Sequence, residues 1–120
     1  MFALSVKQPL AWLIVNGYKK EEFRSWKPYH LGRILIHAST NTNKEALVEI
    51  RKIVPRVLLL KGGVIGSVHV TDFRWDTKLN CWCWGLSKPE TLPFLRIPGK
   101  VGLFSIDDSL LGNRLPKQPS

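Results

Sequence analysis

The sequence predicts the α+β class, arranged as a small mixed β-barrel of five to six strands with two or three peripheral helices. Two observations lead to this prediction. Most apolar segments have the length and composition of strands, whereas only two early segments have helical character. In addition, the longest apolar segment contains Gly62, Gly63 and Gly66, which suggest a bend or bulge of the kind found at barrel corners.

The chain length indicates one domain. At 120 residues, with 44% hydrophobic and 22% charged residues, the chain is large enough to bury a core without disulfides or metal. We expect this domain to span residues 1–110. Residues 111–120, "LGNRLPKQPS", are polar and contain prolines, so we expect them to form a flexible tail.

The first strand is predicted over residues 2–7, "FALSVK". A short helix follows over residues 9–16, "PLAWLIVN", because Pro9 suits the first helical turn, where its missing N–H costs nothing. This segment is apolar on nearly every side, so we expect the helix to be buried. Gly17 is able to adopt the left-handed conformation that ends a helix.

Two further strands are predicted over residues 21–26, "EEFRSW", and 32–39, "GRILIHAS". Successive side chains of a strand point to opposite faces. In the first of these strands, Phe23 therefore lies on one face, and the residues at positions 22, 24 and 26 lie on the other.

A second helix is predicted to begin at Thr42. Thr42 and Glu45 have the T-x-x-E spacing of a capping box, in which each side chain bonds to the backbone of the other. Apolar residues with helical spacing follow, and Pro55 ends the run.

In the second half of the chain, the sequence pattern predicts strands only. The long segment 62–75 and the segment 81–87, "CWCWGLS", are strand candidates, and residues 101–107, "VGLFSID", close the set. Between the last two lies "KPETLPFLRIPG", residues 88–99, which we interpret as a proline-rich connection.

The net charge favours a polyanionic partner. Lys and Arg number 18 and Asp and Glu number 9, so the formal charge is 18 − 9, or +9. Such an excess attracts nucleic acid first and anionic membrane surfaces second. The alternative is a basic protein without such a partner.

The termini and the cysteines point to a cytoplasmic protein that is not bound to a membrane. "MFALSVKQPL" lacks the basic region followed by an apolar region of a signal peptide, and no apolar stretch is long enough to span a bilayer. Cys81 and Cys83 have no neighbouring His or Cys to complete four zinc ligands, so we expect reduced thiols. We predict no metal and no organic cofactor.

One cluster of residue types suits a nucleobase. Lys19 follows the first predicted helix, Glu22, Arg24 and Trp26 share one strand face, and Gln8 precedes the helix. Together they provide an amine, a carboxylate, a guanidinium, an aromatic plane and an amide. These groups match the edge hydrogen bonds, the stacking and the phosphate neutralisation that a nucleotide requires. The alternative is a surface ion pair between Glu22 and Arg24, worth less than about 1 kcal/mol.

Further residues are candidates for ligand contacts. His37 and Ser39 share one face of a predicted strand, although a histidine in a strand is more often a hydrogen-bonded structural residue. Trp82 and Trp84 share a face and suit either base stacking or core packing. The remaining candidates for RNA contacts are Lys7 and Lys100.

The motifs resemble those of the ASCH domain, the activating-signal-cointegrator homology family. The matching segments are "ALSVKQPLAWLIVNGYKKEEFRSW", "GRILIHAS", "GGVIGSVHVTDF" and "IPGKVGLFSID", and they occur in the family's order over nearly the whole chain. The resemblance implies a PUA-like fold with a cleft and an RNA-related role. It places the cleft residues at Gln8, Lys19, Glu22, Arg24 and Trp26. The chain departs from the family pattern at Leu10 and Phe23, where an aromatic residue and an asparagine are usual.

The resemblance also leaves an enzymatic role open. Some ASCH members are amidohydrolases that deacetylate N4-acetylcytidine with a Lys, a Thr and a Glu. Lys19 matches that lysine, whereas the threonine position falls on Glu22. We predict a domain that binds RNA or a modified nucleoside. The alternatives are an amidohydrolase or an RNA-cleaving hydrolase with Lys19 and Glu22 as catalytic residues, and a protein-interaction module of a transcription or translation complex.

Overall fold

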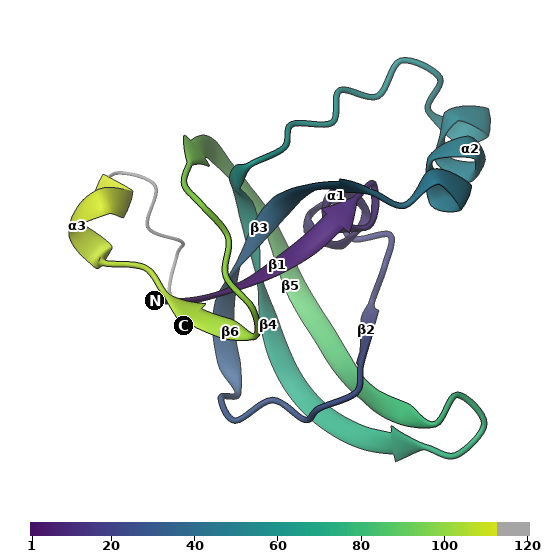
Figure 1. The fold of residues 1–120 in the computed structure, drawn as a ribbon, viewed down its shortest axis with the longest axis vertical. Helices are drawn as coiled ribbons and strands as arrows, with labels where there is room; N and C mark the ends of the chain where they lie inside the picture. Colours follow the sequence, from purple (N-terminus) through teal and green to yellow (C-terminus); the bar gives the residue numbers. More distant parts are fainter. Residues whose placement is uncertain (113–120) are drawn as a thin grey trace.

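A computed structural model describes residues 1–112 and confirms the α+β class (Figure 1). A six-stranded sheet is accompanied by three helices within that part of the chain. The elements are β1 (Phe2–Gln8), α1 (Leu10–Val15), β2 (Glu21–Arg24), β3 (Gly32–Thr42), α2 (Lys44–Ile53), β4 (Gly63–Asp76), β5 (Cys81–Arg96), β6 (Leu103–Ser105) and α3 (Asp108–Leu111).

The sheet has the strand order β2-β5-β4-β3-β1-β6. The β1–β3 pair is parallel, and the other pairs are antiparallel. The long β4–β5 hairpin extends below the rest of the sheet in Figure 1, while α2 lies at the opposite end. Among the described helices, none is long and apolar enough to cross a membrane.

The backbone does not close the sheet into a barrel, which corrects the predicted architecture in that respect. β6 pairs only with Phe2–Leu4, so the following part of β1 has a free edge, and β2 pairs only with β5 in the described chain. These two edges nevertheless come close to each other, since the guanidinium of Arg24 on β2 donates to the backbone oxygen of Ser5 on β1 at 3.0 Å. We call this opening between β1 and β2 the seam.

The sheet has an apolar cluster on each face. On the inner face, buried residues such as Leu4, Ile34 and Trp84 pack against α1. On the outer face, Leu35 packs with Phe104 of β6 and with α3. Because the alternate residues of a strand point to opposite faces, the central strands are apolar on both sides, as their nearly continuous hydrophobic runs indicate.

Gly66 allows α1 to approach the sheet. A β-carbon at this position would lie 2.3 Å from the backbone oxygen of Glu90 and 2.6 Å from Cγ1 of Val15 on α1. The register of β4 and β5 also shifts between Val64 and Gly66. The bulge that the glycines of this segment predict is therefore confirmed.

The N-cap of the second helix lies one residue later than predicted, and α2 begins at Lys44. Thr42 is still the last residue of β3, and the N-cap is Asn43, whose side chain accepts a hydrogen bond from the amide of Ala46 at 3.0 Å. The predicted capping box of Thr42 and Glu45 is therefore wrong. Asn43 has extended backbone angles and a short polar side chain, both of which suit an N-cap.

The predicted connection over residues 88–99 is also wrong, because β5 continues to Arg96. Pro89 and Pro93 are tolerated within this strand for a positional reason. β2 pairs with β5 only as far as Gly85, so the later half of β5 has a free edge on that side. Proline is acceptable at a free edge because no ladder hydrogen bond is required there.

A third helix, α3, agrees with the predicted two or three helices, but no pattern in the sequence predicts its position. Asp107 caps it by accepting from the amide of Ser109 at 2.9 Å, and Leu111 at its end is fully buried. The rest of the tail predicted for residues 111–120 lies, from residue 113 on, outside the described residues.

We expect Gly66→Ala to destabilise the fold by about 2–4 kcal/mol, because a backbone oxygen and a helix side chain leave no room for the added methyl group. Gly102→Ala is the matched control. Gly102 has a φ of 73° and nothing within 4 Å, so only backbone strain of about 1 kcal/mol is added there. Urea unfolding of both variants measures the difference, and equal losses would contradict the steric explanation.

Candidate functional site

The seam contains a cluster of three charged side chains centred on Glu22. The carboxylate of Glu22 lies 3.2 Å from Nζ of Lys19 and 2.9 Å from Nη2 of Arg24. Lys19 follows the turn at Gly17, whose φ of 83° ends α1 in the left-handed conformation, as predicted. Glu22 and Arg24 come from the same side of β2, as the spacing predicts. We call Lys19, Glu22 and Arg24 the seam cluster.

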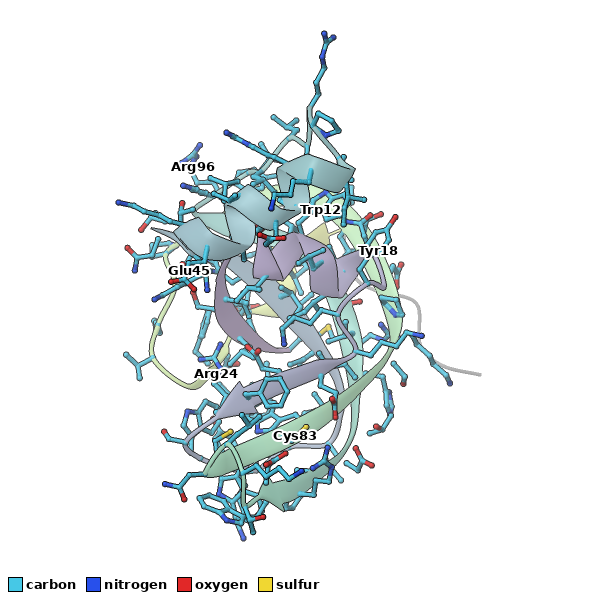
Figure 2. All side chains as sticks on the ribbon, turned by 90° about the vertical axis from the view of Figure 1, so that its right-hand side faces the viewer. Trp12, Tyr18, Arg24, Glu45, Cys83 and Arg96 are labelled. Carbon is cyan, nitrogen blue, oxygen red and sulfur yellow. The ribbon has the colours of Figure 1, made fainter. Side chains whose placement is uncertain are left out.

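The seam cluster is not a surface ion pair. Glu22 is only 5% exposed, and its cross-strand neighbour Trp84 is fully buried. Both carboxylate oxygens are satisfied, one by Lys19 and the amide of Phe23, the other by Nε and Nη2 of Arg24. Two cations surround one anion, so the cluster keeps a formal charge of +1. Figure 2 looks onto β2 and shows Arg24 at the end of that strand, on the side of β1.

Trp26 belongs to the core. β2 ends at Arg24, so the predicted alternation does not continue to Trp26. Its ring packs edge-to-face on Trp84 at 4.9 Å, and its backbone oxygen accepts from the indole of Trp84 at 3.2 Å. Trp26 thus lies on the inner side of the sheet with Glu22, but its ring contributes to packing.

Gln8 is also turned into the protein. Its side chain is fully buried, its amide donates to the backbone oxygen of Leu60 at 2.8 Å, and its carbonyl accepts from the amide of Trp12 at 3.0 Å. Both ends of Gln8 therefore hold α1 against the segment that precedes β4. Gln8 follows Lys7 in the sequence and is therefore close to the seam, but its side chain lines a separate cavity of about 210 Å³.

Two adjoining cavities form a groove from the seam to the loop before β6. The cavity at the seam has a volume of about 490 Å³, and its neighbour has about 660 Å³; Ser5 and Ser39 line both. We call the two together the β1–β3 groove. Six of the predicted ligand-binding residues line it, namely Lys7, Glu22, Arg24, His37, Ser39 and Lys100.

The lining of the β1–β3 groove is positively charged. Its cations are Lys7, Arg24, Arg96 and Lys100, and its one acid is Glu22, which is already paired with two cations. The sequence interpretation missed Ser5 and Arg96. Ser5 had a usable signal, because it precedes Lys7 by two positions on the same strand. Arg96 had none, since its segment was interpreted as a connection.

His37 holds one wall of the groove in place. It is 2% exposed, its Nε2 lies 2.6 Å from the backbone oxygen of Ile97, and its Nδ1 lies 3.1 Å from the hydroxyl of Ser5. A carbonyl oxygen only accepts, so Nε2 carries the proton, and in the neutral ring Nδ1 accepts from Ser5. A β-carbon on Gly99 would lie 2.8 Å from the imidazole, so the loop before β6 covers this histidine closely. His37 is thus bonded on both sides.

Lys19 lines a separate cavity on the other side of the seam cluster. This cavity of about 300 Å³ has an apolar floor that includes Ile14, Val68 and Leu86, with Lys19 and Lys20 at its rim. Lys19 therefore reaches the groove through its ion pair with Glu22 and does not line the groove itself.

The thiols lie on the opposite face of β5 from the seam cluster. Cys83 is 2% exposed and donates to the carboxylate of Glu21 at 2.9 Å. Burial, together with this carboxylate, raises the pKa of the Cys83 thiol to about 11. Within residues 1–112, no three potential metal ligands of the His, Cys, Asp or Glu type come together.

The comparisons with known proteins agree with the resemblance seen in the sequence. A family model, the ASCH domain, matches residues 4–87. Among solved structures, ASCH from Zymomonas mobilis has a TM-score of 0.63 and 15% identity, covering 92% of this chain and 90% of that chain. Two mutant forms of the same protein have TM-scores of 0.63 and 0.62 at 14% and 15% identity, each covering 93% of this chain and 92% and 94% of their own. At these identities the structures show a shared fold. No curated protein matches the sequence.

We expect Glu22→Gln to lower the free energy of unfolding by about 1–3 kcal/mol, because it removes the charge that holds two partly buried cations together. Glu49→Gln is the matched control, since Glu49 and Lys52 form an exposed pair 3.1 Å apart. Urea unfolding at neutral pH measures both variants. A loss in Glu22→Gln no larger than in Glu49→Gln would show that the seam cluster is energetically equivalent to a surface pair.

We expect one fast and one slow thiol in the folded protein. With a pKa of about 11, roughly one Cys83 in a thousand is a thiolate at about pH 8, and the thiolate is the reactive form. Cys81 is partly exposed and reacts first. Iodoacetamide labelling followed by peptide mass spectrometry distinguishes the two, with the denatured chain as the control in which both react. Equal labelling rates in the folded protein would contradict this assignment.

Proposed function

The chain belongs to the ASCH domain family, and from this premise we propose that it binds single-stranded RNA or a modified nucleoside in the β1–β3 groove. ASCH domains have a PUA-like fold that is associated with RNA binding. The observation that carries the proposal is the lining of this groove, which contains four cations and one acid, Glu22, that is already paired with Lys19 and Arg24.

The groove offers separate groups for phosphates and for bases. Lys7, Arg96 and Lys100 are exposed cations along its length and suit phosphate contacts, which position a strand without reading its sequence. Ser39 and Asn41 lie between them and provide hydroxyl and amide groups for base edges. Arg24 is held by Glu22 and Ser5, so its guanidinium is oriented before a ligand arrives.

The hydrolase alternative is less well supported. A lysine that acts as a general base needs a free lone pair. Nζ of Lys19 instead donates to the carboxylate of Glu22 and to the backbone oxygen of Glu21. The arrangement suits a fixed positive charge better than a proton acceptor. We therefore assign Lys19 and Glu22 to the organisation of the seam.

We expect fluorescence anisotropy to show binding of a labelled oligouridine of about twelve nucleotides that weakens steeply between about 50 and 200 mM salt. Alanine variants of Lys7, Arg96 and Lys100 should each reduce the salt slope by about 0.7, since each removes about one phosphate contact. Lys52→Ala is the control, because Lys52 lies on α2 and pairs with Glu49.

Three results would overturn this function. Binding that is absent at low salt, or equally affected by Lys52→Ala, would remove the groove as the RNA site. Release of acetate from N4-acetylcytidine that disappears in Lys19→Met would favour the hydrolase alternative instead.

A further inference from the structure

We propose that the inner face of the β4–β5 hairpin is a base-stacking site for a single strand of RNA that continues from the seam. The inference rests on the proposed function and extends it to a second surface. The site consists of Phe73, Trp75 and Trp82, which we call the aromatic strip. The hairpin that carries it extends beyond the body of the sheet in Figure 1.

The strand register places the aromatic strip beside the seam cluster. Arg24 lies opposite Trp82, and Trp82 lies opposite Trp75. Directly opposed residues of antiparallel strands project to the same face. Neighbouring strands are about 4.8 Å apart, so the row from β2 to β4 spans about 10 Å. At about 3.4 Å per stacked nucleotide, this length accommodates about three bases.

Phe73 and Trp75 are exposed, Trp82 is partly buried against the core, and the three rings hold one another in place. Phe73 is 37% exposed and Trp75 is 44% exposed. Trp84 projects from the same face of the sheet but is fully buried. Trp82 packs edge-to-face against Trp75 at 5.4 Å and against Phe73 at 5.7 Å. An edge-to-face contact occupies the face of only one ring, so ring faces remain available to a base. Rings fixed in this way lose little further freedom when a base stacks on them.

The charges around the aromatic strip favour a polyanion. Nζ of Lys27 lies 5.9 Å from the ring centre of Trp82, and Arg24 borders the strip on β2. The acids of the hairpin, Asp72 and Asp76, alternate with the aromatic residues and therefore project to the other face. Aromatic rings bordered by cations match a single-stranded nucleic acid, which has both bases and phosphates. An interface with a second protein would instead be depleted in lysine at its core.

The test compares Trp75→Ala with Leu79→Ala in the full chain. Leu79 is 58% exposed in the same hairpin but has no ring, so it controls for loss of apolar surface. Two probes of equal length are used, an oligouridine of about twelve nucleotides and its abasic counterpart. We expect Trp75→Ala to weaken oligouridine binding roughly 5- to 100-fold, to leave abasic binding and the salt slope unchanged, and to be rescued by Trp75→Phe. Leu79→Ala should have no effect.

Several results would overturn the inference. Unchanged oligouridine binding in Trp75→Ala would remove the stacking site while leaving the groove intact. An equal loss for the abasic probe, or in Leu79→Ala, would exclude stacking as the cause. Dissociation of a wild-type dimer by Trp75→Ala, measured by sedimentation, would identify the strip as a protein interface. If the wild-type chain binds neither probe, the proposed function itself fails and the inference fails with it.

Discussion

The buried carboxylate of Glu22, held between Lys19 and Arg24, is the interaction on which the rest of the structure depends. It orients the guanidinium that reaches across the seam to Ser5, so it connects β1 and β2 although these strands share no ladder. Removing a charge from water is costly unless every lone pair finds a partner, and here both oxygens are fully used. One carboxylate therefore orients Arg24 and, through Arg24, supports the contact between β1 and β2.

The open seam explains why a groove exists at this place. If backbone hydrogen bonds joined β1 to β2, the space now occupied by polar side chains would be filled by a ladder. Because β6 covers only the first part of β1, the edge from Ser5 onward remains available to side chains and to a ligand. The same opening leaves His37 and the loop before β6 to form the far wall of the groove.

The inner face of the sheet changes its character along the β4–β5 hairpin. Near the body, Trp84 is sealed by Trp26 and by the strands around it, and contributes to the core. Beyond the body, no layer formed by residues 1–112 covers the same face, so Phe73 and Trp75 are exposed in the described part of the chain. Aromatic residues therefore line this face at both places, and what differs is whether other segments bury them. This difference separates a structural tryptophan from residues that are free to stack on a ligand.

Local patterns in the sequence determined the class of the protein, its strands, the buried helix α1 and the shared face of Glu22 and Arg24, because all of these follow from periodicity within a few residues. Only the tertiary structure decided that Gln8 and Trp26 turn inward and that Arg96 joins the groove. It also decided that β5 continues through two prolines and that the sheet remains open. These features depend on which strand edge stays unpaired and on which distant segment covers a side chain. Pairing between residues far apart in the chain sets both, and no local pattern encodes it.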